Sequence, residues 1–91
     1  ASTFFVRVAG DSMINAGIHH NDILIVDRSL DVTDKKIIIA CLNGELTVKR
    51  VRLKNNRVRL EPENDRYQTL FVDTDMSFEV WGVATHVIHS L

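Results

Sequence analysis

Ninety-one residues are enough for one small domain, whose single core is only marginally stable at this size. Hydrophobic residues make up 45% and charged residues 25%, as in ordinary globular domains, and acidic and basic residues are interspersed to a formal net charge of −1. No basic face, zinc-finger spacing or helix-turn-helix pattern is visible. We therefore expect no sequence-specific DNA binding by this domain.

Cysteine usage and hydropathy indicate the compartment. Cys41 is the only cysteine, which excludes an internal disulfide and a cysteine-rich metal site. A chain without disulfides fits a reducing compartment. The longest apolar run, 37–42, is too short to span a bilayer, and the first residues carry no signal-peptide pattern. The sequence predicts a cytoplasmic protein without a membrane segment.

Short segments rich in β-branched and aromatic residues follow one another along the chain. In the first, Phe4, Val6 and Val8 alternate on one face, which is typical of a strand. Met13–Ile18 is predicted as one short helical turn, and the last strand is long enough to bend at Gly82. The predicted strands are 3–9, 23–26, 36–42, 45–53, 57–61, 69–72 and 77–88.

Two pairs of residues predict hairpin turns. Asn43-Gly44 lies between two apolar runs and favours a two-residue type I′ turn. Asn55-Asn56 is a second hairpin turn, since asparagine tolerates a positive φ. No repeat or linker divides the chain. The sequence thus predicts one mostly β domain, with β-hairpins and a curved sheet or small barrel.

Ser12, after the Gly10-Asp11 break, is either a nucleophile or only a serine in a turn. A serine hydroxyl needs a base to take its proton, and histidine is the usual one. His19 and His20 lie in a loop, whereas His86 and His89 face opposite sides of the last strand, so we interpret all four as solvated. No third side chain evidently converges on them, and no metal site is predicted.

Lys49 is the other candidate base. The apolar alternation of its strand slips between Val48 and Val51, and a bulge at Lys49-Arg50 would explain the slip. Without a bulge, Lys49 shares the face of Thr47 and Val51. A desolvated lysine has a lowered pKa and can act as a base. The alternative is a lysine that extends its ammonium into water.

Five motifs occur along the chain: Gly10-Asp-Ser-Met13, Gly17-Ile18, Asp22-Ile-Leu-Ile-Val-Asp27, Gly44-Glu-Leu-Thr-Val-Lys-Arg50 and Pro62-Glu-Asn64. These motifs resemble the LexA/UmuD family of Ser–Lys self-cleaving proteins of the bacterial DNA-damage response. They cover nearly the whole chain in the family's order, and Lys49 follows Ser12 by 37 residues, the family's nucleophile-to-base spacing. The Gly-Asp-Ser-Met form of the first motif and the ending 81–89 resemble the UmuD branch and its processed core.

The resemblance implies a fold and a site. The fold would be mostly β with strongly curved sheets, like LexA and the signal peptidases. Ser12 would be the nucleophile and Lys49 its general base, and backbone N–H groups around Ser12 would hold the oxyanion. Gly10, Asp11 and Met13 would support this turn, as would Ile18. Neither a cofactor nor a metal is implied.

The resemblance also implies a domain organisation and partners. Residues 1–91 would form a single Ser–Lys peptidase-like domain, and the bond to be cut, between a small residue and glycine, would lie in an upstream segment. RecA filaments would stimulate cleavage, and the product would form a homodimer and join a UmuC-like Y-family DNA polymerase. The alternative is the C-terminal dimerisation and self-cleavage domain of a LexA-type repressor. The last strand, 78–88, is either an edge for pairing between chains or covered internally.

Two loops depart from the family's pattern. Lys35-Lys36 stands where relatives usually have Gly-Asp, and His20-Asn21-Asp22 stands where many have Asp-Gly-Asp. Because these are loop positions, we expect the fold to survive and surface contacts to change.

Overall fold

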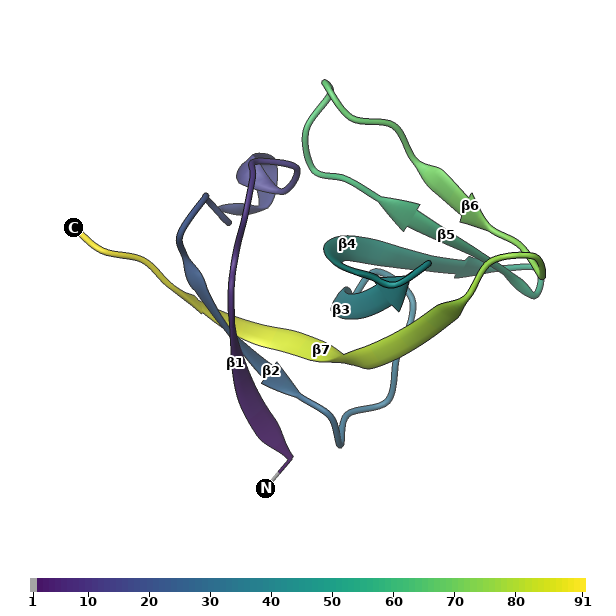
Figure 1. The fold of residues 1–91 in the computed structure, drawn as a ribbon, viewed down its shortest axis with the longest axis horizontal. Coiled ribbons are helices and arrows are strands. Elements are labelled where there is room, and N and C mark those ends of the chain that lie inside the picture. Colours follow the sequence, from purple (N-terminus) through teal and green to yellow (C-terminus); the bar gives the residue numbers. More distant parts are fainter. Residues whose placement is uncertain (1) are drawn as a thin grey trace.

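Seven antiparallel strands form one continuous sheet in the computed structural model, which describes residues 2–91 (Figure 1). Their order across the sheet is β1-β2-β7-β3-β4-β5-β6. The strands are β1 (Thr3–Arg7), β2 (Ile23–Asp27), β3 (Ile37–Leu42), β4 (Glu45–Lys54), β5 (Arg57–Glu61), β6 (Leu70–Val72) and β7 (Phe78–Ile88). All seven predicted strands are present, and a 3-10 turn, η1 (Ile14–Ala16), lies in the predicted helical segment. The mostly β prediction is confirmed.

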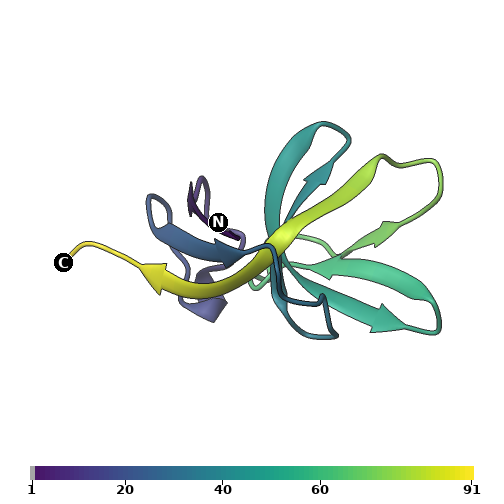
Figure 2. The ribbon, with the colours of Figure 1, turned by 90° about the horizontal axis from the view of Figure 1, so that it is seen from below.

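The long strand β7 curls the sheet by joining its two halves (Figure 2). Residues 83–88 pair with β2, and residues 78–83 pair with β3. Register shifts on the two sides leave Thr85 and Trp81 without a partner in these pairings, and such bulges bend a strand. A Cβ on Gly82 would lie 2.7 Å from Val26 Cγ1 and 3.0 Å from the backbone oxygen of Asp27, so glycine permits the close crossing next to the predicted bend.

Both predicted hairpin turns are confirmed by the backbone. Asn43 and Gly44 have φ of 49° and 86°, and Asn55 and Asn56 have φ of 53° and 59°. Two successive positive φ values define a type I′ turn, whose twist matches that of the strands it joins. These turns set the β3–β4 and β4–β5 registers, which place Val48 opposite Ile39 and Val51 opposite Leu60.

The core is divided into two clusters, one on each side of this curled sheet. Val48 packs against the first cluster, whereas Val51 belongs to the second. This division, and not a bulge, explains the slip in alternation, because the pairing of β4 runs without a shift through Lys49 and Arg50. The predicted bulge is therefore wrong. Buried in the first cluster are Val8, Met13, Ile18, Leu24, Val26 and Ile39, and in the second Ile38, Ala40, Val51, Leu60 and Val83.

The outer strands of the sheet are β1 and β6, and β7 lies between β2 and β3 in the strand order. Each half of β7 nevertheless pairs on one side only, because β2 and β3 take different halves. Across residues 2–91, the structure contains no helix with the length and apolar character needed to cross a membrane.

Candidate active site

The turn that carries Ser12 connects β1 to η1 at one end of the molecule. Gly10 opens the turn with φ of +84°, a conformation that glycine adopts without steric strain. Met13 follows Ser12 and is buried in the first cluster, with 2% of its surface exposed. Full burial of such a side chain stabilises a fold by roughly 1.5–3 kcal/mol. Ser12 thus lies between Gly10, whose backbone allows the turn, and Met13, whose buried side chain fixes the turn to the core.

The loop between β5 and β6 packs against the Ser12 turn and fixes it (Figure 1). The Glu63 N–H donates to the Ser12 carbonyl oxygen at 2.8 Å, and the Asn15 N–H donates to the Glu63 carbonyl oxygen at 2.8 Å. Asp11 receives two more bonds, from the Asn64 side-chain amide to its carbonyl at 2.9 Å and from the Tyr67 hydroxyl to its carboxylate at 2.5 Å. The Pro62-Glu-Asn64 motif therefore buttresses the Ser12 turn.

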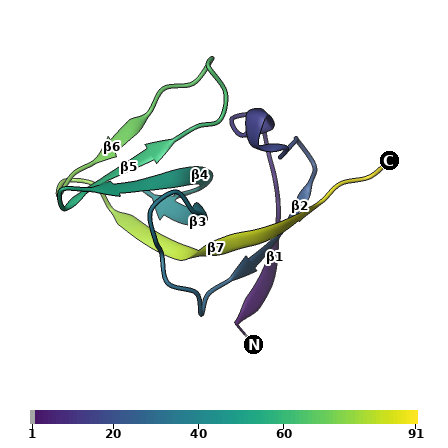
Figure 3. The same ribbon diagram turned by 180° about the vertical axis from the view of Figure 1, so that it is seen from behind.

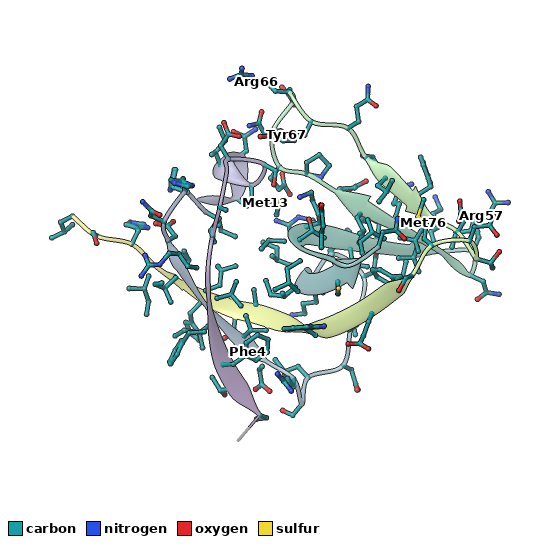
Figure 4. All side chains as sticks on the ribbon, viewed as in Figure 1. Phe4, Met13, Arg57, Arg66, Tyr67 and Met76 are labelled. Atoms are coloured by element: carbon teal, nitrogen blue, oxygen red, sulfur yellow. The ribbon has the colours of Figure 1, made fainter. Side chains whose placement is uncertain are left out.

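Sequence reasoning assigned no role to Asn64 or Tyr67. Figure 4 shows Tyr67 and Met13 on the two neighbouring segments, which lie about 50 residues apart in the chain. Asn64 is buried at 7% exposure, and its side-chain oxygen accepts the Arg66 N–H at 3.0 Å. The hydrogen bond to Asp11 raises the pKa of the Tyr67 hydroxyl. For Asn64 the sequence offered only its place in the Pro62-Glu-Asn64 motif, and for Tyr67 it offered no signal, because both contacts form only in the folded chain.

Lys49 reaches Ser12 from the middle of β4. Its Nζ donates to Ser12 Oγ at 3.0 Å, to Thr47 Oγ1 at 2.9 Å and to the Val48 carbonyl oxygen at 3.0 Å. Thr47 and Lys49 share a face of β4, because the register is continuous. The Lys49 ammonium is held by these three partners and does not extend into open water. The alternative of a solvated lysine therefore differs from the structure.

Burial lowers the pKa of the Lys49 ammonium below its ordinary 10.5. The cause is desolvation, which disfavours the charged form. Within residues 2–91 no carboxylate lies within 4.0 Å of Nζ to restore the charge. A neutral amine has two N–H donors and one lone pair. In the neutral form, donation to Thr47 and Val48 would use both donors, and the hydrogen bond to Ser12 would reverse so that the hydroxyl donates to the lone pair.

Three backbone N–H groups beside Ser12 have no acceptor among the described residues. Those of Asp11, Ser12 and Met13 take part in none of the hydrogen bonds of residues 2–91. Unpaired N–H groups next to a nucleophile can hold a developing oxyanion. Gly10 differs, because its N–H donates to His20 Nδ1 at 2.9 Å.

A cleft of about 240 Å³ opens in front of Ser12 and Lys49. One wall is formed by residues 6–9 at the end of β1, and the other by residues 46–49 of β4. Ile39 lines the cleft, and Leu46 is half-exposed at 51%. Extended peptides are commonly bound along strands, so the walls of this cleft are of a type that can receive one.

The histidines divide into two groups. None of them hydrogen-bonds to Ser12 within the described part of the chain, and His86 Nδ1 lies 2.9 Å from the hydroxyl of its neighbour Thr85. His19 and His89, however, lie together beside Asp22. The prediction that no third side chain converges on these histidines is therefore wrong. The sequence placed Asp22 in a family motif and in a loop before β2, but nothing in that pattern related it to His89, 67 residues later.

Both loops that depart from the family pattern keep the backbone that glycine would adopt. Lys35 has φ of +74° and Asn21 has φ of +72°. Asparagine visits this region at little cost, whereas lysine is strained there. The fold survives these substitutions, as predicted.

In this all-β domain a serine hydroxyl is hydrogen-bonded to a half-buried lysine, a residue type that can act as the base for a serine nucleophile in place of histidine. Comparison with known proteins agrees: the peptidase S24-like family model matches residues 1–85. The chain belongs to this family.

Curated relatives extend beyond the length of this chain. MucA from Escherichia coli is 44% identical over 94% of the chain and 59% of its own length. ImpA from Salmonella typhimurium is 43% identical over 98% of the chain and 60% of its own length. The LexA repressor of Clostridioides difficile is 40% identical over 96% of the chain and 41% of its own length. The chain thus spans about 60% of the first two relatives.

Proposed function

We propose that this chain is the Ser–Lys catalytic core of a UmuD-like protein of the SOS response to DNA damage. Ser12 is the nucleophile of a self-cleavage reaction, and Lys49 is its general base. The contact between Lys49 Nζ and Ser12 Oγ at 3.0 Å carries the proposal, because a desolvated amine at that distance can accept the hydroxyl proton. Membership of the peptidase S24-like family supports it.

The reaction is an acyl transfer. Ser12 Oγ attacks the carbonyl carbon of the scissile peptide bond while its proton passes to Lys49 Nζ. The N–H groups of Asp11, Ser12 and Met13 are available to bind the resulting oxyanion. Lys49 then returns the proton to the leaving amine as the C–N bond breaks, and water hydrolyses the ester on Ser12. The cleft between β1 and β4 receives the substrate strand, with a small residue before glycine.

The first experiment tests activation of the serine without a peptide substrate. A fluorophosphonate should label Ser12, detected by mass spectrometry of the peptide that contains it, and Lys49→Ala should abolish the labelling. Ser29, which hydrogen-bonds to Asp27 on an exposed turn, is the matched control and should stay unlabelled. Equal labelling of both serines would contradict the role of Lys49.

The second experiment tests cleavage. MucA is incubated alone or with this chain, and the additional cleavage product is compared for the wild-type chain, Ser12→Ala and Lys49→Ala. We expect only the wild-type chain to increase the product, and RecA filaments on single-stranded DNA to accelerate its formation. If all three chains behave alike, the pair is not catalytic.

After self-cleavage, the shortened protein acts in the cytoplasm as a homodimer and joins a UmuC-like Y-family polymerase for translesion synthesis. The identity to MucA and ImpA supports this role, and the unpaired sides of the two halves of β7 offer backbone groups for pairing between chains. The match to a LexA repressor supports the alternative of a repressor's C-terminal domain. Co-purification with a Y-family polymerase favours the first, and operator binding by the full-length protein favours the second.

A further inference from the structure

Three potential metal ligands meet where β7 ends and β2 begins. His19 Nδ1 lies 3.6 Å and His89 Nδ1 lies 3.7 Å from the same oxygen, Oδ2 of Asp22. One ligand atom from each residue lies within 4.8 Å of those from the other two. Figure 3 shows the yellow end of β7 beside β2, so residues 67 or more apart in sequence share this corner. In the part of the chain that the structure describes, no other such group of three occurs.

Asp22 is the fixed member of the group. Only 5% of its side chain is exposed, and Oδ2 accepts the His19 backbone N–H at 2.7 Å. Its own carbonyl oxygen accepts the Val8 N–H at 2.8 Å, which ties the residue to the chain after β1. A buried carboxylate requires compensation for its charge. The two imidazoles are more than half exposed, so they can adjust to a ligand.

The distances suit a tetrahedral cation. Separations of 3.6 and 3.7 Å are too long for hydrogen bonds between imidazole and carboxylate. Zinc bonds of about 2.0–2.1 Å place tetrahedral ligand atoms roughly 3.3–3.4 Å apart. The Asp22–histidine separations nearly match this value. The two imidazoles must approach each other by at most about 1.4 Å, which rotation of exposed side chains can supply.

We propose that His19, Asp22 and His89 bind a divalent transition metal of the zinc class, with water in the fourth position. Two imidazole nitrogens and one carboxylate oxygen suit Zn²⁺, whereas Ca²⁺ and Mg²⁺ require mainly oxygen ligands. The metal would join the end of β7 to the loop before β2. That loop also holds the Ser12 turn, because His20 Nδ1 accepts the Gly10 N–H. The site is independent of the catalytic proposal.

Calorimetric titration of the 91-residue chain with ZnCl₂ tests the site directly. We expect one Zn²⁺ per chain. His19→Gln and His89→Gln should each weaken binding by more than the roughly 10- to 100-fold typical of outer-shell mutations, because each removes a ligand. His86→Gln is the matched control, since it removes a histidine three residues from His89 that lies outside the group. Cys41→Ser controls for binding to the free thiol.

Thermal unfolding provides a second measurement that does not depend on the heat of binding. Zn²⁺ should raise the midpoint of the wild-type chain and of His86→Gln, but not of the double variant His19→Gln/His89→Gln. Unfolding without zinc shows whether the variants are folded. The proposal is overturned if the wild-type chain does not bind Zn²⁺, or if binding survives the double variant or disappears in Cys41→Ser.

Discussion

The side-chain amide of Asn64 donates to the backbone carbonyl of Asp11, 53 residues earlier in the chain, at 2.9 Å. This bond joins the β5–β6 loop to the residue that precedes Ser12. Together with the bond from the Glu63 N–H to the Ser12 carbonyl, it fixes the turn in addition to its buried anchor, Met13. The position of the nucleophile is therefore set by a distant segment as much as by its own turn.

Asn64→Ala should destabilise the fold and slow cleavage. Loss of a buried partner for the Asp11 carbonyl and the Arg66 N–H should lower the free energy of unfolding by about 1–3 kcal/mol. Urea unfolding gives this value, and the trans-cleavage assay gives the rate. Asn15→Ala, on an exposed side chain, is the control and should change the free energy by less than about 0.5 kcal/mol. Equal stability of both variants would show that the buttress is unimportant.

Lys49 should make both stability and cleavage depend on pH. Because its pKa is lowered, the folded chain binds fewer protons than the unfolded chain between that pKa and 10.5. The contribution of Lys49 to the free energy of unfolding therefore rises with pH in this window and is constant below it. The difference in free energy of unfolding, Lys49→Met minus wild type, should fall as pH rises. A difference that stays constant up to pH 10.5 would refute a lowered pKa.

The cleavage rate should rise about tenfold per pH unit while Lys49 is mainly protonated, because only the neutral amine is a base. The rate should level off above the pKa of Lys49. Rates in the trans-cleavage assay over a pH series locate this point. A rate that does not change with pH would exclude Lys49 as the titrating base.

Thr47 is expected to be a positioning residue for Lys49. Thr47→Val keeps the shape but removes the acceptor 2.9 Å from Nζ. The rate at the plateau should fall by about tenfold, equivalent to about 1.4 kcal/mol. The rising part of the pH profile should also move to lower pH, because the ammonium loses a hydrogen bond that stabilises it. Thr47→Ser should restore both. A lower rate with an unchanged pH profile would indicate a structural role only.

Lys35→Gly should stabilise the protein. Lys35 has φ of +74°, which is strained for a residue with a Cβ, and its backbone bonds need no side chain. The substitution should relieve about 1–2 kcal/mol of backbone strain, but the greater entropy of glycine in the unfolded chain offsets part of this. The free energy of unfolding should therefore increase by roughly 0.5–1 kcal/mol. Lys36→Gly, at a position without a positive φ, should instead destabilise. Thermal unfolding of both variants decides; a loss of stability in Lys35→Gly would contradict the strain.

Local chemistry along the chain was sufficient to predict the elements. Alternating β-branched residues specify strands, and Asn43-Gly44 and Asn55-Asn56 specify type I′ turns, because these properties depend on a few neighbouring residues. The Ser12–Lys49 pair was expected from the family's motif spacing, and the structure brings the two side chains into contact. Their catalytic roles stay predictions.

Only the tertiary structure shows which face of each strand packs against which of the two core clusters. The slip between Val48 and Val51 looked like a bulge, but the curled sheet packs the two residues into different clusters. Likewise, only folding brings Asn64 to Asp11, and Asp22 to His19 and His89. By itself the sequence determined the strands, turns and family. The curvature of β7 determined how close the strands and loops come to one another in space. A sheet that bends at Trp81 and Gly82 brings together residues that no local pattern relates.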